Sequence, residues 1–502
     1  VRADRADRRA VGDEGAGGGF HHGDGERGAH RIRRRGASSS GGSSASAGAL
    51  GSSGAATSNG DVNFAAAVAV STYRPVTEAY IATTNTVNTS GVLSVSATST
   101  DSVTTRADGS TTGDAATGAG IAVAVGVVEA TTRAYLEDSG GFLVTGGIAV
   151  TATMDADNTF FLEAISGVGD TTQTGVAGSL AIHTAITNVE ALIRDGAGAS
   201  ANLNGGDLTL TATSSTHTVT RAVPHTDVVT TSSLGVGASV ALAILDHDTT
   251  AAIENNARLA NADALSLNAT ATHAAETLAK GGAEATGNSA TVLTPVVAIA
   301  LGFNDTDASI GTGVALTTTG DVGLTASHDS GLLTEALGDA IGGDAAIGAS
   351  LALAITEDTA TARLLRNLTS SAGGVALDAQ GLFRSRANAA ASSKGASDSG
   401  DADGVNQQGN AQAGYGNSQA AGRGVGASGT ASSPDASTSD GSMSVAAAIA
   451  INVQDAEATV TLGPGIALTA DRLAMLRARS NADSLADADG SASSGGSGTI
   501  GA

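Results

Sequence analysis

Large aliphatic residues alternate with small ones along much of this chain. Residues 238–244 read Ala-Ser-Val-Ala-Leu-Ala-Ile, and residues 349–355 read Ala-Ser-Leu-Ala-Leu-Ala-Ile. A two-residue period is typical of a β-strand, because successive side chains point to opposite faces. Each such strand leads to an Asp/Asn-rich stretch predicted to form a corner. A Thr-x-Ala-x-Ile strand, a Gly/Asn turn and a third strand such as 321–326 follow. Helix start and stop signals are absent, so the pattern predicts an all-β chain.

Two sequence anchors repeat with the same period, which indicates seven copies of one unit. The first anchor is small-x-Ala-x-aliphatic, and its central alanines are Ala79, Ala134, Ala191, Ala251, Ala308, Ala362 and Ala458. The second anchor is aliphatic-x-aliphatic-x-Ala, and it ends at Ala97, Ala152, Ala212, Ala269, Ala326, Ala379 and Ala478. The spacings lie between 53 and 60 residues, except for a last spacing of 96 or 99. A sustained period of this length is the signature of a repeat architecture.

A unit of about 57 residues with few aromatic side chains is too small to bury its own core, so neighbouring units must cover one another. This predicts a parallel β-helix, or β-solenoid, built from about seven repeats. Division of each repeat into three coils of 19 residues would give about 20 coils, and strands spaced at about 4.8 Å would then form a rod on the order of 100 Å. The alternative fold is a series of small antiparallel β-sandwiches, which the scarcity of hairpin signals disfavours.

Composition divides the chain into six segments. Nine arginines and six acids give the first segment a net charge of +3, which leaves −27 on the rest of a chain whose total is −24. The low-complexity insertion explains the long last spacing, and the first residue, Val1, leads us to expect a fragment of a longer protein. The predicted segments are a disordered basic arm (1–36), a Ser/Gly linker (37–60), repeats 1–6 (61–386), a low-complexity insertion (387–442), repeat 7 (443–490) and a Gly/Ser tail (491–502).

Composition and charge exclude several classes of protein. The 502 residues include no Cys and no Trp, with 7 Phe and 4 Tyr, so disulfides and thiolate metal sites are excluded. A core made of Val, Ile, Leu and much Ala suits thin layers. The 49 acidic against 25 basic residues argue against nucleic acid as a partner. The longest apolar run, 119–128, ends at Glu129 and is too short for a transmembrane helix.

Motifs for catalysis are missing from the sequence, so we expect a non-catalytic protein without a cofactor. Neither Lys280 nor Lys394 follows a glycine, which excludes a P-loop, and no Gly-x-Ser-x-Gly or His-Glu-x-x-His motif occurs. A polysaccharide-degrading β-helix enzyme with an aspartate-only site is the alternative. Five histidines are expected to be solvated at strand ends and in loops: His217, His225, His247, His273 and His328.

Calcium is the metal to consider. Asp246-x-Asp248 and Asp305-x-Asp307 occupy the predicted corner in adjacent copies, and carboxylates are ligands for this hard cation. Such residues also form plain Asx turns. A calcium-stiffened extracellular repeat protein is therefore a second alternative function. Threonines at alternate positions in 151–153 and 209–213 predict a solvated face, or an ice-binding one if the register were kept, but Ser327 and Gln380 replace threonine in later copies.

The strings 235–244, 248–253 and 265–271 resemble repeats of the leukotoxin-type filamentous adhesins of Gram-negative bacteria, which are similar in style to filamentous haemagglutinins. The resemblance covers residues 61–386 and 443–490. It implies export through the outer membrane by a type V route and a β-helical stalk at the bacterial cell surface. It also implies host cell surfaces, glycans or neighbouring filaments as partners. No catalytic residue is implied.

Overall fold

The computed structural model describes residues 38–47, 62–394, 443–493 and 499–501. Short gaps lie at 84, 112–114, 139–140, 157, 169–170, 196–200, 226–228, 232 and 286–289. The chain divides into two compact units, 1–32 and 33–502, and every described residue belongs to the second. The predicted basic arm and residues 395–442 of the predicted insertion lie outside the described residues.

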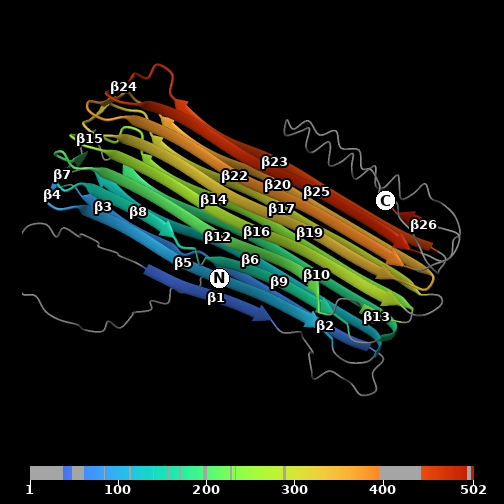
Figure 1. The fold of residues 1–502 in the computed structure, drawn as a ribbon. Coiled ribbons are helices and arrows are strands. Elements are labelled where there is room, and N and C mark those ends of the chain that lie inside the picture. The colour runs from blue at the N-terminus through green and yellow to red at the C-terminus, as the bar shows by residue number, and fades with distance from the viewer. Residues whose placement is uncertain are drawn as a thin grey trace, which may run out of the picture. The chain divides into compact units, whose positions relative to one another are not determined.

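Two large parallel sheets contain most of the described chain (Figure 1). Sheet A consists of β1 (Ser38–Ala47), β5 (Leu93–Ser110), β8 (Ile148–Met154), β9 (Thr159–Gly167), β12 (Leu208–Pro224), β13 (Val229–Thr231), β16 (Leu265–Ala285), β19 (Val322–Ile341), β22 (Val375–Lys394) and β25 (Ala474–Ser493). Sheet B consists of β2 (Val62–Tyr73), β3 (Val76–Thr83), β6 (Ala115–Asp138), β10 (Thr171–Arg194), β14 (Leu234–Ile253), β17 (Thr291–Ile310), β20 (Ala345–Leu364), β23 (Met443–Leu462) and β26 (Thr499–Gly501).

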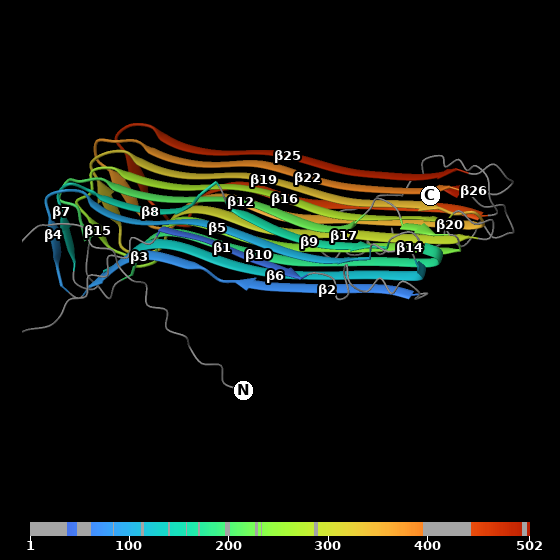
Figure 2. The ribbon, with the colours of Figure 1, turned by 90° about the horizontal axis from the view of Figure 1, so that it is seen from below.

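Two small parallel sheets join the large ones at one end (Figure 2). One contains β4 (Val87–Thr89), β7 (Phe142–Val144), β11 (Ala201–Asn202) and β15 (Leu259–Ala260). The other contains β18 (Leu316–Thr318), β21 (Leu368–Ser370) and β24 (Leu468–Ala470). The chain therefore runs from a long strand of sheet B through a short strand to a long strand of sheet A, and then enters the next coil. Neighbouring coils pair in parallel throughout, which confirms the predicted parallel β-solenoid of seven repeats.

Each repeat forms one broad coil, so the predicted division into three coils of 19 residues is wrong. The long strands β14, β17 and β20 each span 20 residues, about 66 Å of extended chain. Seven coils at about 4.8 Å rise only about 34 Å, far short of the expected rod. The polar stretch taken for a corner, around Asp246, lies inside the continuous strand β14. The alternation of inward and outward side chains therefore continues through the polar residues of β14 without interruption.

The strand register follows the sequence anchors. Ala134 of β6 pairs with Ala191 of the next coil, and Ala379 of β22 pairs with Ala478, which lies beyond residues 395–442. The last copy of the first anchor departs from the prediction, because Ala362 pairs with Val460 instead of Ala458. The 57-residue spacing in the sequence is therefore the step from one coil to the next.

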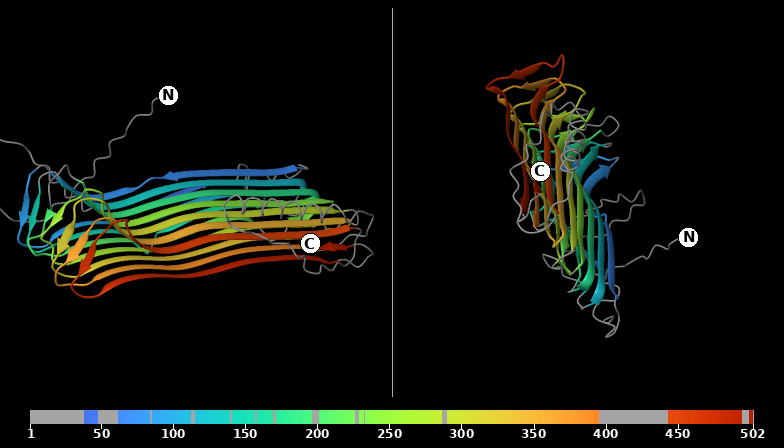
Figure 3. Two further views of the ribbon diagram at one scale, coloured as in Figure 1. Left: turned by 90° about the horizontal axis from the view of Figure 1, so that it is seen from above. Right: turned by 90° about the vertical axis from the view of Figure 1, so that its right-hand side faces the viewer.

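Each coil is thick at the end with the short strands and thin at the other end (Figure 3). Large aliphatic and aromatic side chains fill the thick end, where Leu136, Phe142 and Ile148 are fully buried. At the thin end the sheets meet through their backbones. A Cβ added at Gly237 would lie 2.4 Å from the carbonyl oxygen of Gly282. Inward positions there are mostly Gly, Ala and Ser, and the larger Val292, Thr294 and Val296 of β17 are buried beside them.

This narrow spacing determines which face of sheet B holds the larger residues. In β14 the buried inward residues include Ala241 and Ala243, while Val240, Leu242 and Ile244 point outward. The expected core of Val, Ile, Leu and Ala is thus present at the thick end, whereas at the thin end of sheet B alanine faces inward and the larger aliphatics face outward.

Several strands lie within segments that composition marked as linker, insertion or tail. Strand β1 lies in the predicted linker 37–60, and residues 387–394 complete β22 rather than belonging to the insertion. Strand β25 extends to Ser493, and β26 occupies residues 499–501 of the predicted tail.

Candidate functional site

A band of buried polar side chains lies halfway along the coils, between the aliphatic thick end and the thin end. Its main members are four histidines from neighbouring coils: His183 and His247 from sheet B, and His273 and His328 from sheet A. Each is at most 5% exposed. The expectation that His247, His273 and His328 are solvated is wrong, because they share the inward phase of the buried alanines. His217 and His225 are exposed, as expected.

The histidine rings pack against one another across and along the stack. The His247 and His273 rings stack with centroids 4.5 Å apart, and the His328 ring contacts that of His273 edge-on at 5.6 Å. Thr187 and Thr216 hydroxyls bond to Nδ1 of His247 and His273, each at 2.8 Å. Alternation in the sequence was sufficient to place these rings inward, since His183 has the same phase as Ala181 and Ala185.

Burial keeps this histidine column uncharged. Desolvation lowers the pKa of His183 to about 4 and that of His247 to about 3, with neighbouring histidines adding to the effect on His247. Burial likewise lowers the pKa of His273 well below its usual range. Neutral imidazoles tolerate close stacking because no like charges repel.

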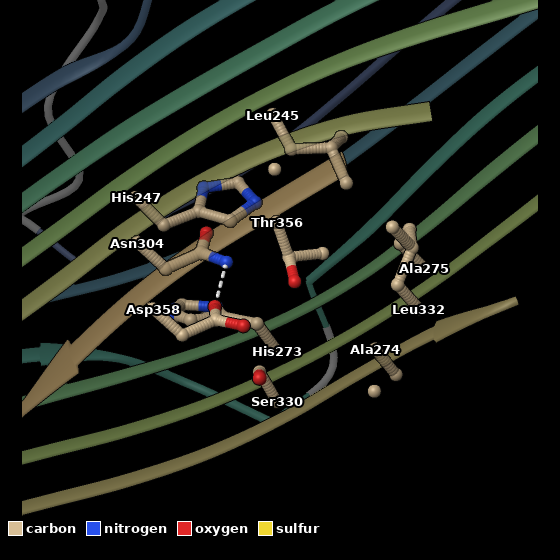
Figure 4. Close-up of a pocket in the computed structure, with 12 residues that line it drawn as sticks. Leu245, His247, His273, Ala274, Ala275, Asn304, Ser330, Leu332, Thr356 and Asp358 are labelled. Atoms are coloured by element: carbon tan, nitrogen blue, oxygen red, sulfur yellow. Dashed lines mark hydrogen bonds between the residues drawn. The ribbon is translucent and has the colours of Figure 1, made fainter. Parts of the chain in front are cut away.

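A small cavity of about 20 Å³ lies beside the column (Figure 4). The Asn304 amide donates to an Asp358 carboxylate oxygen at 2.6 Å. His273 Nε2, Asn304 Oδ1 and Thr356 Oγ1 are buried atoms of the lining without a protein hydrogen-bond partner. A cavity of this size and polarity fits one water molecule. It has no room for a sugar ring or a peptide.

Ser330, His328 and Asp358 come together beside this cavity. The Asp358 carboxylate accepts a hydrogen bond from Ser330 and lies 3.9 Å from His328 Nε2. Desolvation raises the pKa of Asp358 and lowers that of His328. In a nucleophilic triad the imidazole lies between hydroxyl and carboxylate. Here the carboxylate lies between the other two groups, and all three are buried, so the arrangement supports packing rather than acyl transfer.

The four predicted calcium residues lie on the outer face of sheet B. Asp248 pairs in register with Asp305, whereas Asp246 pairs with Phe303, so the two Asp-x-Asp motifs are offset by two residues. Desolvation and the charges of Asp246 and Asp305 raise the pKa of Asp248 to about 6. Asp307 is engaged by Arg363, whose Nε donates at 2.9 Å.

Of the four predicted calcium residues, Asp246, Asp248 and Asp305 are therefore carboxylates that repel one another, whereas Asp307 is paired with Arg363. Within the described part of the chain, no group of three or more His, Cys, Asp or Glu residues is arranged to hold a metal ion.

Hydroxyl side chains line up on the outer face of sheet A. Thr98, Thr153, Thr213 and Thr270 occupy one column in successive coils, and Ser327 continues it. The register therefore keeps a hydroxyl through five coils and loses it at Gln380 and Arg479, which is more continuous than the sequence indicated. The alternating sequence pattern predicts that these hydroxyl residues point outward. The strand register in the structure shows in addition that they are neighbours.

Outward charges on sheet B form a ladder that sequence reasoning missed. Arg133 of β6 contacts Glu78 of the preceding coil at 3.4 Å and also pairs with Glu190 of the following coil. Arg194 pairs with Glu254 at 3.6 Å and covers the Tyr135 ring at 4.1 Å. The sequence did contain a signal for this ladder, because Glu78 and Glu190 each lie about one repeat period from Arg133.

Comparisons with known proteins found no matching family model, no matching curated protein and no matching solved structure. The architecture on its own defines the class as a parallel β-solenoid with one coil per repeat. In the described residues, no helix is long and apolar enough to cross a membrane.

Proposed function

We propose that this chain is a non-catalytic structural segment of a secreted bacterial surface adhesin, acting as a stalk or passenger. The observation that carries the proposal is the regular register of seven coils, which places similar residues of successive coils in columns. Such columns offer many weak contacts that add through multivalency. The sequence resemblance supports the surface location and type V export.

The polar face of sheet A supports glycans as the ligand class. Its column of hydroxyls, from Thr98 to Ser327, places donors and acceptors about 4.8 Å apart along the stack. Asn268 and Thr325 extend a second column beside it. Neutral hydroxyl and amide groups hydrogen-bond to sugars without the desolvation cost of charge.

A glycan array with the chain displayed in many copies on beads tests this function. We expect binding by the beads and a loss of at least about tenfold after Thr213→Val and Thr270→Val, because both hydroxyls lie at the centre of the column. Thr250→Val on the outer face of sheet B is the matched control. Beads that bind no glycan and no host cell above a denatured control would overturn the proposal.

A further inference from the structure

The outer face of sheet B carries a block of large aliphatic side chains, interrupted by one column of mostly small residues such as Gly178, Ala238 and Ala349. We call it the apolar face and define it as the outward residues of 64–72, 119–127, 176–184, 236–244, 293–301, 347–355 and 445–453, which are neighbours in register. Val240, Leu242 and Ile244 of β14 lie beside Val297, Ile299 and Leu301 of β17. The pattern is repeated from coil to coil.

Most of these side chains contact solvent because they point outward from sheet B, whereas Val445 is only 8% exposed. Phe64 is 55% exposed, Val68 61% and Ile121 42%. Within a flat sheet the neighbours shield each other's flanks, so Leu242 and Ile299 are half-buried while their outer ends stay uncovered. Contiguous apolar surface of this extent marks an interaction site in a soluble protein.

The size of the apolar face matches a stable protein–protein interface. Nine residues along each strand extend about 26 Å, and seven strands rise about 34 Å, which gives about 900 Å². Two such faces would bury about 1,800 Å² in total, within the usual range for a specific complex. Flat sheets with regular rows of aliphatic side chains also pack well against each other, as in β-sandwiches.

Charge beside the apolar face determines the orientation of such a pair. Asp246, Asp248 and Asp305 border it on the thick-end side, and Glu357 and Asp455 continue the acidic row in later coils. A parallel arrangement would place acid opposite acid. A two-fold axis that lies between the two faces and runs parallel to the stack reverses the strands. It places each acidic row opposite the thin edge, where Leu234, Thr174 and Thr117 are uncharged and Asp344 is the exposed acid of β20's edge.

We propose that the apolar face binds a second copy of this chain in an isologous, face-to-face dimer with antiparallel strands. The same patch serves both partners, which closes the contact after two copies. The acidic row and the net charge of −24 disfavour the alternative of an anionic lipid surface. The dimer rests on the apolar face alone and leaves the hydroxyl face of sheet A free, so it does not depend on the proposed glycan binding.

Sedimentation equilibrium of the full chain tests the oligomeric state. We expect twice the 48.2 kDa chain mass at about 10 µM. The double variant Leu242→Glu/Ile299→Glu places charge at the centre of the face and is expected to raise the dimer Kd at least about 100-fold. Thr270→Glu/Ser327→Glu, on the outer face of sheet A, is the matched control and should remain dimeric. Far-UV circular dichroism verifies that all variants fold.

Cross-linking tests the orientation. The sequence has no cysteine, and Val240 lies in the central strand near the predicted axis, so Val240→Cys should link to itself through a short bismaleimide while Thr270→Cys should not. A monomeric wild-type chain at about 100 µM would overturn the proposal. Monomers that float with neutral lipid vesicles would assign the face to a membrane surface and overturn it equally. Loss of glycan binding with an intact dimer would overturn the proposed function alone.

Discussion

Arg366 offers a demanding test of how the coils are held together. This side chain is 2% exposed and lies in the turn between β20 and β21, where no carboxylate among the described residues pairs with it. Its guanidinium donates to the carbonyl oxygens of Ala257 at 2.6 Å, Glu254 at 2.8 Å and Thr312 at 2.9 Å, and also to that of Gly311. One side chain therefore joins the turns of three successive coils.

Arg366→Met keeps much of the side-chain volume and removes all four hydrogen bonds. The carbonyl oxygens of Glu254 and Thr312 also accept backbone N–H bonds from Ala257 and Asn256, so the substitution leaves those of Gly311 and Ala257 unsatisfied. Each buried carbonyl left unsatisfied costs about 2 kcal/mol, and hydrogen bonds to a charged donor are stronger than neutral ones. Relief of the guanidinium's own desolvation, which lowers its pKa, offsets part of this loss. We expect a net decrease of about 3 kcal/mol in the free energy of unfolding.

Urea denaturation measures this loss, and Arg363→Met is the control. Arg363 is 45% exposed and pairs with Asp307 at 2.9 Å, a surface interaction worth at most about 1 kcal/mol. Because solenoids unfold in part coil by coil, amide hydrogen exchange at residues 254–257 and 311–312 should also speed up in Arg366→Met alone. Equal free energies of unfolding for Arg366→Met and Arg363→Met would refute the view that the buried Arg366 side chain stabilises the turns of three coils.

Three further outcomes follow from the packing and the shifted pKa values. Gly237→Ala should lower Tm strongly because the added Cβ meets the Gly282 carbonyl. Gly178→Ala has open space around the added Cβ and should leave Tm unchanged. Equal melting temperatures of the two variants would contradict the close backbone contact at Gly237. The folded pKa of His183 lies below its unfolded value, so its contribution is complete above pH 6.5 and falls by about 1.4 kcal/mol per unit as pH drops toward 4. A urea series on His183→Gln should show a pH slope smaller by this amount, because the other buried histidines keep their own contributions. An unchanged slope would disprove the assignment. The pKa of Asp248 is raised to about 6 in the fold, so the charged carboxylate destabilises the fold at pH 7. Asp248→Asn should therefore raise Tm at pH 7 and have no effect below pH 4, where the carboxyl is protonated in both states. A lower Tm at pH 7 would indicate a favourable role for the charge.

The period and most of the register could be predicted from sequence because the anchor alanines pair with their counterparts in every step except that from Ala362 to Ala458. Ala152, Ala212 and Ala269 occupy one buried column, where a larger residue would push against the core between the sheets. The number of coils per repeat could not be predicted. Alternation identifies a strand but does not fix its length when polar residues such as His247 and Asp248 continue the pattern in mid-strand.

The inward face of sheet B also lay beyond sequence reasoning. Alternating Ala and Leu in 349–355 fits either orientation, and hydrophobicity favours burying leucine. The spacing between the sheets decides the matter, and contacts such as the Ser350 hydroxyl to the Ala390 carbonyl, at 2.7 Å, set that spacing. The buried cluster of Ser330, His328 and Asp358 likewise depends on which coils meet.

The chain passes from sheet A to sheet B at the thin edge of every coil, and there its length is free to vary. Coils that flank residues 395–442 pair as regularly as coils joined by a few residues, since Ala345 meets Met443 and Lys394 meets Ser493. Guest sequences inserted at 286–289 should therefore be carried without altering the stack, whereas at 342–344 they would break the bonds of Gly342 to Lys394 and of Asp344 to Ala290. Insertion points of this kind recur along a single edge of the stack. The protein could therefore display foreign peptides at a regular spacing set by the distance between coils.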